Sequence, residues 1–380
     1  MAATGTGGDS KQIEQHVLSG NGPVNNFRDG VFPEAKELDC TKIKIGMEGC
    51  WACPIRCKKV VQFEEPYRVD AAYGGPEYES ISALGSNCGV DNLKAILKAN
   101  ERCGAYSMDT LSTGVSISFA MECYEKGLLT KKDTGGIDLK FGNDEALLKV
   151  IDLIAHREGI GNLIAEGTAR MAAKLGKGSE KFAMNAKGLE FGQYEPRIMM
   201  RPGLGLGFMV NPNGADPGGS FGPMMMNSPE GVKMLHPLGI YEPVPPGDWG
   251  PRGVYMFMLG QFKSYLEDSL VTCGFVPYNL KMESDLLNAV TGWDTTLPEL
   301  TKTAERILTT ERLFNTKQGL TDANDSLPER CYQPKVGGEV SLKPLDKAEM
   351  EKIRNTYYTL MGWDNQGKPL PERVEALSIF

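Results

Sequence analysis

Three cysteines lie within eight residues in the segment CWACPIRC at positions 50–57. A cubane iron–sulfur cluster takes four thiolates, often three from one turn-rich loop and one from elsewhere. The spacing of Cys50, Cys53 and Cys57 supplies three such ligands, and it is hard to explain by packing. Pro54 would keep the loop from continuing as a helix, and the neighbouring Arg56 would offset some thiolate charge. The segment therefore predicts a metal centre, with an iron–sulfur cluster as the favoured occupant.

Zinc is the alternative occupant, because Cys-x-x-Cys also opens many zinc sites. Zinc modules usually supply their second pair of ligands as another Cys-x-x-Cys or as two histidines. The chain has three dispersed histidines and no second Cys-x-x-Cys. The spacing thus favours a cluster over zinc and leaves zinc open.

The remaining cysteines are dispersed, and the total of nine is odd. An odd number in a chain without a secretory signal argues against a disulfide framework. A lone cysteine is usually a small buried hydrophobic residue. We expect that role for Cys88, Cys103, Cys123 and Cys331.

The composition excludes several classes of partner. The 380 residues carry 49 acidic and 41 basic side chains, a net charge of −8, and no long basic run. Nucleic acid and anionic membranes are therefore poor partners. No apolar run approaches the roughly 20 residues that span a bilayer, and the first residues lack the pattern of a secretory signal. We expect a cytoplasmic protein.

Helical patterns dominate the first half of the chain. Asp91 is expected to cap a helix that begins at Asn92. Thr110 is expected to open a long helix that ends at Gly127, and Asn143 to cap the next. The segment NLIAEGTARMAAKLG follows, with a stop at Gly176.

Residues 188–252 are rich in glycine and proline, which indicates a long, ordered, non-repetitive stretch. Its GLGLG at 203–207 is a weak match to a dinucleotide-binding loop, because no strand–turn–helix unit with a downstream acid surrounds it. Helical patterns resume at ESDLLNAVTG, LPELTKTAERILTTERLF and DKAEMEKIRNTYYTLMG. We predict a mainly α protein with two helical domains: residues 1–186, which contain the cysteine loop, and residues 187–380, a Gly/Pro-rich segment followed by a helical C-terminal domain.

The segment CWACPIRC resembles the C-x-x-C-P-I-x-C signature of the aldehyde ferredoxin oxidoreductase family of tungsten-pterin enzymes. Further segments resemble the family in the same order, and the likeness extends from before Cys50 to Trp363. These are GPEYESISALGSNCGVDNL, MDTLSTGVSISFAMECYEKGLLT, GNLIAEGTARMAAKLGKGSEKFAMNAKGLE, DSLVTCGF, VTGWDTTLPEL, ERLFN, LPER and YYTLMGW. The resemblance implies the fold of domains 2 and 3 of that family. The family's N-terminal β domain, with its pterin phosphate-binding loop, has no counterpart here, so we expect it on a separate polypeptide or lost by truncation.

The resemblance also implies a set of site residues. The family motif D-x-x-G-L-C corresponds to Asp268-Ser-Leu-Val-Thr-Cys273, which makes Cys273 the fourth cluster ligand and Asp268 a pterin contact. The motif departs from the family at Val271-Thr272. Asp109 corresponds to a second pterin contact, although Gly104 replaces the acidic residue that opens that motif. Asp109 is also a candidate N-cap of the following helix.

Glu79, in GPEYES, occupies the position of the family's active-site glutamate. A buried carboxylate there, with a raised pKa, would suit general acid–base work; a salt-bridged loop glutamate is the alternative. The family's second active-site group is a histidine in G-A-D-H, which here reads Gly214-Ala215-Asp216-Pro217. His236 is the nearest downstream histidine, but a core or surface role is the simpler interpretation.

The function implied by the resemblance is oxidation of an aldehyde to a carboxylate, or the reverse. The implied cofactors are tungsten or molybdenum bis-pterin and a [4Fe-4S] cluster, which would pass electrons to ferredoxin or an electron-transfer subunit. Two alternatives stay open: a non-catalytic iron–sulfur scaffold, electron-transfer subunit or truncated remnant, and an acyl-thioester or aromatic-ring reductase of the same family.

Overall fold

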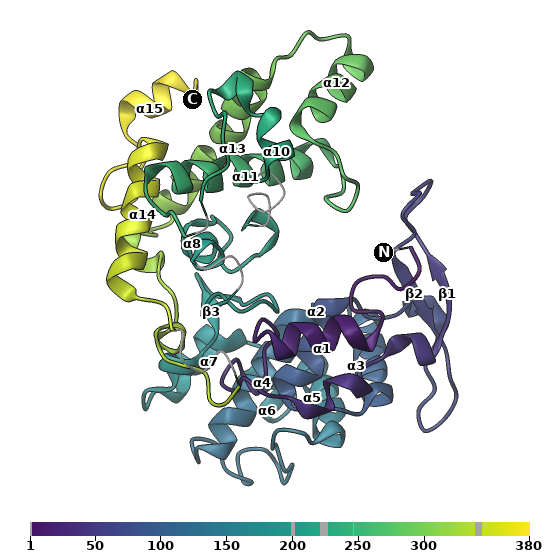
Figure 1. Cartoon of the computed structure of the whole chain (residues 1–380). Helices are drawn as coiled ribbons and strands as arrows, with labels where there is room; N and C mark the ends of the chain where they lie inside the picture. The colour runs from purple at the N-terminus through teal and green to yellow at the C-terminus, as the bar shows by residue number, and fades with distance from the viewer. Residues whose placement is uncertain (1, 199–201, 221–226, 246, 339–343) are drawn as a thin grey trace. The chain divides into compact units, whose positions relative to one another are not determined.

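The computed structural model of the chain describes residues 2–198, 202–220, 227–245, 247–338 and 344–380. The chain forms two units. Unit 1 comprises Met1–Met199 and Leu327–Leu345, and unit 2 comprises Met200–Ser326 and Asp346–Phe380. Helices dominate both units, and the strands of the described residues form two small two-stranded sheets (Figure 1). The expected mainly α class is confirmed.

Unit 1 carries the N-terminal half of the helices and both sheets. Its helices and strands are α1 (Ser10–Leu18), β1 (Lys44–Glu48), β2 (Lys58–Val61), α2 (Tyr78–Leu84), α3 (Leu93–Ala105), α4 (Thr110–Glu125), α5 (Asp144–His156), α6 (Ile160–Ile164), α7 (Gly167–Leu175), β3 (Asn185–Ala186) and β4 (Leu189–Glu190). Its short 3-10 helices are η1 (Pro33–Glu37), η2 (Cys40–Lys42), η3 (Ala71–Tyr73), η4 (Ser86–Cys88), η5 (Ser179–Phe182) and η9 (Glu329–Tyr332).

Helix α4 is the centre of unit 1. Its residues 113–123 are all buried, as expected for a helix that is surrounded by other elements. Helix α2 packs directly on it at Gly114, where an added Cβ would lie 2.5 Å from the carbonyl oxygen of Ala83. Only glycine permits this approach, and the contact fixes the position of α2, which begins one residue before Glu79.

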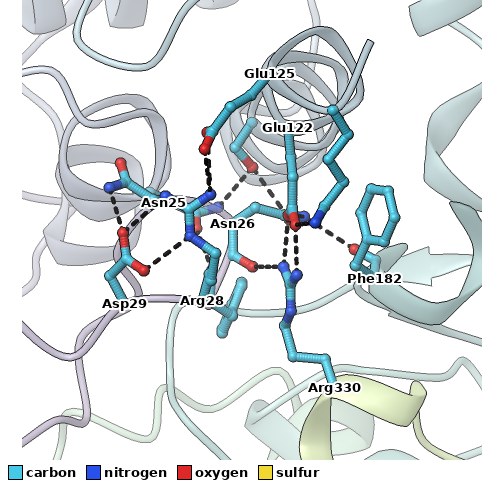
Figure 2. Close-up of polar contacts among 12 residues, drawn as sticks. Asn25, Asn26, Arg28, Asp29, Glu122, Glu125, Phe182 and Arg330 are labelled. Atoms are coloured by element: carbon cyan, nitrogen blue, oxygen red, sulfur yellow. Dashed lines mark hydrogen bonds and ion pairs between the residues drawn. The ribbon is translucent and has the colours of Figure 1, made fainter. Parts of the chain in front are cut away.

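A buried polar network ties the returning segment 327–345 into unit 1 (Figure 2). Arg330 donates to both carboxylate oxygens of Glu122 on α4, each at 2.6 Å, and to the carbonyl oxygen of Asn26 at 2.7 Å. The Asn26 side chain donates to Glu122 at 2.7 Å. Lys335 and Arg197 flank the buried Glu195 in the same way. Bidentate arginine–carboxylate pairs of this kind are specific as well as strong.

Unit 2 is built around the long helix α11, which packs against α13 and α14. Residues Gly253–Val254 and Met256–Lys263 of α11 are buried. The elements of unit 2 are α8 (Gly203–Val210), η6 (Gly218–Ser220), α10 (Pro229–Lys233), η7 (His236–Leu238), α11 (Pro251–Leu270), α12 (Leu280–Thr291), α13 (Leu297–Lys317), η8 (Asp322–Asn324), α14 (Lys347–Met361) and α15 (Pro371–Ala376). In the described parts of the chain, no helix is both long and apolar enough to cross a membrane.

Most of the expected helix boundaries are confirmed. The Asp109 side chain caps α4 at Thr110, the Asn143 side chain caps α5, and Gly176 follows α7 with a φ of 62°. The expected cap at Asp91 is wrong by one residue, because the Asn92 side chain accepts from the backbone N–H of Ala95. The GLGLG segment forms the first half of helix α8, so it is not a phosphate-binding loop.

Candidate functional site

The cysteine loop connects the two strands of a β-hairpin. The sequence analysis did not predict this hairpin. Strands β1 and β2 pair antiparallel, with Glu48 opposite Lys58, so residues 49–57 connect them. The N–H of Cys53 donates to the carbonyl oxygen of Cys50 at 3.0 Å. The loop takes left-handed backbone at Ala52 and Arg56, with φ of 56° and 50°. As expected from Pro54, the loop does not continue as a helix.

Close contacts at the base of the loop hold its shape. An added Cβ on Gly49 would lie 2.9 Å from the Cα of Arg56, so the two arms of the loop touch at this glycine. Arg56 also reaches back to donate from Nη2 to the carbonyl oxygen of Met47 at 3.1 Å. The loop is thus closed by its own backbone and by one arginine.

The nine cysteines fall into an accessible and a buried set. Cys50 and Cys273 are exposed, and Cys53 and Cys57 are half-buried. The other five are fully buried. Burial raises the thiol pKa to about 12 in Cys40, Cys103, Cys123 and Cys331, and it also raises the pKa of Cys88.

The buried role expected for four of these cysteines is therefore confirmed. A thiol with so high a pKa is a poor source of the thiolate that metals bind. The accessible set is the same as the set of predicted ligands. This match concerns donor chemistry only: in the described ranges, no three His, Cys, Asp or Glu side chains are gathered closely enough to hold a metal ion.

Glu79 lies in the first turn of α2 and is half-buried. Its Oε1 accepts from the backbone N–H of Gln193 at 2.9 Å, while the hydroxyl of Tyr78 donates to the carbonyl oxygen of Gln193 at 3.0 Å. Burial, followed by the negative charge of Glu79, raises the pKa of the Tyr194 hydroxyl. The carboxylate thus sits beside two phenols and holds the backbone of residue 193.

His16 joins this group, although no motif around it indicated a functional role. Its ring lies 4.4 Å from that of Tyr78 and 5.9 Å from that of Tyr194, measured between centroids. Burial lowers the pKa of His16, so the ring is neutral at physiological pH. Its Nδ1 lies 2.8 Å from the side-chain nitrogen of Asn21.

Asp109 caps α4 and lines a cavity of about 520 Å³ in unit 1. Its carboxylate accepts from the N–H of Ser112 at 2.6 Å, which confirms the N-cap interpretation. Arg157 and Arg170 line the same cavity, and Arg157 pairs with Glu166 at 2.6 Å. The cavity therefore offers both carboxylates and guanidinium groups to a ligand.

Asp268 lines a second cavity, of about 540 Å³, in unit 2. Three carboxylates share its wall: Asp216, Asp268 and Glu311. Desolvation and then the charge of Asp216 raise the pKa of Asp268, and burial and then the charge of Asp268 raise that of Glu311. Such a cavity favours ligands that donate hydrogen bonds or bring positive charge.

Asp216 directly precedes Pro217, the position of the missing family histidine. His236 is exposed on η7, against the ring of Tyr241 at 5.3 Å between centroids. It is not among the described residues that line the cavity of Asp268. The exposed position of His236 agrees with the simpler interpretation, a core or surface histidine, and places it at the surface.

Cys273 follows α11, which ends where Val271 takes left-handed backbone with φ of 57°. The carbonyl oxygen of Cys273 accepts from the N–H of Val276 at 2.9 Å, which closes a turn and leaves the thiol exposed. Cys273 belongs to unit 2, and the other three predicted ligands belong to unit 1. The four-cysteine set stays a prediction.

Comparison with known proteins identifies the family. A family model described as aldehyde ferredoxin oxidoreductase, domains 2 and 3, matches residues 2–379. The chain belongs to the aldehyde ferredoxin oxidoreductase family.

Relatives within the family include the tungsten-containing aldehyde ferredoxin oxidoreductases of Pyrococcus furiosus and Thermococcus kodakarensis. Each is 36% identical over 380 residues, covering 96% of this chain and 58% of the relative. The WOR-like subunit of an aliphatic sulfonate oxidoreductase from Pyrococcus furiosus is 26% identical over 375 residues, covering 94% of this chain and 55% of that subunit. The chain thus spans little more than half the length of these relatives.

A solved structure shares the fold. It is the active site complex BamBC of benzoyl coenzyme A reductase in complex with 1,5-dienoyl-CoA, with a TM-score of 0.70 and 20% identity. The match covers 98% of this chain and 59% of the other. It extends the family fold over both units of the chain.

Proposed function

We propose that the chain forms domains 2 and 3 of a tungsten- or molybdenum-pterin oxidoreductase that interconverts an aldehyde and a carboxylate. The reaction takes R–CHO and water to R–COOH, two protons and two electrons. Family membership supports this assignment, together with one observation on the chain itself: its accessible cysteines are the four that match the family's cluster ligands. When bound, the metal–pterin group would supply the two-electron chemistry.

In this proposal Cys50, Cys53 and Cys57 of the cysteine loop, together with Cys273, would hold a [4Fe-4S] cluster, which would supply one-electron transfer to ferredoxin or to an electron-transfer subunit. The thiols fit that role because they are accessible and the remaining five are buried. Asp109 and Asp268 each line a cavity, where a carboxylate can accept the N–H groups of a pterin. Arg157 and Arg170, which line the same cavity as Asp109, would suit the phosphate groups of the pterin.

Glu79 is the proposed proton acceptor. It is half-buried, lies beside Tyr78 and Tyr194, and its Oε1 is fixed by the N–H of Gln193. Taking one proton from the hydrated aldehyde is general base work, for which such a positioned carboxylate is suited. The phenols and the neutral His16 would limit water around it.

The rest of the active enzyme is also part of the proposal. A β domain like the family's N-terminal domain, supplied by a partner chain, would complete the pterin site, and a cytoplasmic location would keep the thiols reduced. The first alternative, an iron–sulfur scaffold or electron-transfer subunit, predicts iron without tungsten or molybdenum. The second alternative, reduction of an acyl thioester or aromatic ring, is favoured by Pro217 in place of the family histidine.

Metal analysis under anaerobic conditions separates these functions. We expect tungsten or molybdenum in stoichiometric amount when the chain is co-expressed with a β-domain partner, and aldehyde-dependent reduction of a dye acceptor. Glu79→Gln should keep the metals and lose most of the activity, since it removes the proton acceptor without changing shape. Iron alone would indicate the scaffold, and activity with a coenzyme A thioester but not with aldehydes would indicate the reductase.

A further inference from the structure

Helix α12 exposes a row of apolar side chains on the surface of unit 2. These residues recur every three or four positions, as expected for one face of a helix, and the large ones are between 43% and 77% exposed. We call the row the α12 stripe, and its members are Met282, Leu286, Ala289, Val290 and, just after the helix, Trp293. In Figure 1, α12 lies at the side of unit 2 opposite α14.

The buried side of α12 is the more polar one. It includes Glu283, which is 1% exposed and accepts no hydrogen bond from a described residue. The ammonium group of Lys263 lies 3.8 Å away. A surface helix normally buries its apolar face and exposes its charged one, so the pattern of α12 is reversed. A continuous exposed apolar row of this kind marks an interaction surface.

Polar contacts fix the orientation of α12, so the stripe cannot turn inward. The Asn279 side chain caps the helix by accepting from the N–H of Met282 at 2.8 Å. Ser284 donates to the carbonyl oxygen of Thr295 at 2.8 Å. Asn288 donates to the same oxygen at 3.0 Å and accepts from the N–H of Thr295 at 2.8 Å. The stripe is thus held in place before any partner binds, which lowers the entropic cost of docking.

The two ends of the stripe carry opposite charges, which favours a second copy of the chain as the partner. Lys281 directly precedes the stripe and Asp294 directly follows it, and both are exposed. Lys281 pairs with Asp285 at 2.6 Å, an exposed pair of the kind that contributes little to stability. Two antiparallel copies of α12 related by a two-fold axis would bring Lys281 of each copy to Asp294 of the other.

The same axis also matches the apolar residues. The midpoint in sequence between Lys281 and Asp294 is the midpoint between Leu286 and Ala289, so a large side chain would meet a small one at the centre. It is also the midpoint between Met282 and Trp293, which would place a thioether against an indole, a favourable contact, at each end. Charge and side-chain size therefore agree on one antiparallel arrangement.

We propose that the α12 stripe is a self-docking surface, through which two copies of the chain form an antiparallel, two-fold symmetric dimer. The inference goes beyond the proposed function and needs no bound cofactor. The described residues that line the cavities of Asp109 and Asp268 do not include any of the stripe. One helix face is small beside permanent dimer interfaces, which bury more than about 2,000 Å². We therefore expect a dissociation constant of about 1–100 µM.

Sedimentation equilibrium of the purified 380-residue chain, at concentrations that bracket this range, tests the dimer. The wild type should pass from monomer to dimer. Leu286→Glu should weaken the dimer at least about tenfold, because it puts a carboxylate at the centre of the apolar contact. Its circular dichroism should not change, since Leu286 is 43% exposed. Leu18→Glu, on the exposed end of α1, is the matched control and should dimerise as the wild type does.

A wild type that stays monomeric over the whole range would overturn the proposal and leave the stripe to a different protein. A Leu286→Glu variant that dimerises as well as the wild type would also overturn it.

A charge exchange tests the antiparallel arrangement. Lys281→Glu and Asp294→Lys each place like charges at both ends of their own dimer, so each alone should dimerise more weakly than the wild type. An equimolar mixture of the two variants should dimerise more strongly than either, because both ends then regain opposite charges, and added salt should reduce the gain. A mixture that is no stronger than the separate variants would overturn the antiparallel pairing.

Discussion

Buried carboxylates are hydrogen-bonded differently in the two units. In unit 1, Glu122 receives two bonds from Arg330 and one from Asn26, so its carboxylate is fully satisfied (Figure 2). In unit 2, Glu283 receives none and shares the ammonium group of Lys263 with Glu267. The first arrangement fixes one structure, and the second leaves a group ready to bind a proton.

The pKa values express the same difference. Burial opposes the ionisation of Glu195 in unit 1, but Arg197 and Lys335 outweigh it and lower its pKa to about 2. Burial dominates at Glu283 and raises its pKa to about 7. The number and geometry of the cationic partners, not the depth of burial, decide the sign.

The largest effect on the free energy of unfolding is expected when a buried, fully hydrogen-bonded carboxylate is removed. Glu122→Ala would leave Arg330 buried without its carboxylate, so we expect a loss of about 3–5 kcal/mol in the free energy of unfolding. Glu125→Ala is the matched control, because Glu125 pairs with Arg28 on the surface; it should cost less than about 1 kcal/mol. Urea unfolding measures both, and equal losses would refute the distinction.

Replacing Glu283, the carboxylate without a hydrogen bond from a described residue, should raise the free energy of unfolding rather than lower it. Between pH 4.5 and 7 the native state keeps a proton on Glu283 that the unfolded chain releases, so the free energy of unfolding falls as pH rises through this window. Glu283→Gln does not titrate. Relative to wild type it should therefore gain about 3 kcal/mol between pH 4.5 and 8.

Urea unfolding of wild type and Glu283→Gln at pH 4.5 and pH 8 measures this gain. Glu230→Gln changes an exposed carboxylate of α10 and should behave as wild type at both pH values. A difference between wild type and Glu283→Gln that does not change with pH would contradict the assignment.

The smallest effects on protein stability are expected from substitutions at the two predicted pterin contacts, Asp109 and Asp268. Asp109→Ala removes the cap of α4 and should cost about 1 kcal/mol. Asp268→Asn should cost nothing, since desolvation and Asp216 already disfavour the charged form of Asp268. Thermal unfolding compares the two. A loss in Asp268→Asn as large as that in Asp109→Ala would show that Asp268 has a structural partner.

Local signals in the sequence predicted much of the fold. The caps at Asp109 and Asn143 were predictable because an Asx side chain before a helical pattern acts within three residues. The buried cysteines were predictable because a lone thiol usually packs as a small apolar group.

Features that depend on distant residues were not predictable. Arg330 and Glu122 are 208 positions apart, so nothing local marks their pairing or the return of segment 327–345 to unit 1. Lys263 and Glu267 have the spacing of an ordinary surface helix pair, and only the packing of α12 shows that they are buried beside Glu283. The hairpin around the cysteine loop was missed because its strands are four and five residues long.

The central claim is that Cys50, Cys53, Cys57 and Cys273 hold one iron–sulfur cluster. It is tested most directly by the iron content and the electron paramagnetic resonance spectrum of anaerobically purified wild type, Cys53→Ser, Cys273→Ser and Cys331→Ser. We expect about four iron atoms per chain and a reduced-cluster signal in wild type and in Cys331→Ser. Both should be lost to the same extent in Cys53→Ser and Cys273→Ser. Equal iron in all four proteins, or a single zinc ion in place of iron, would contradict the claim.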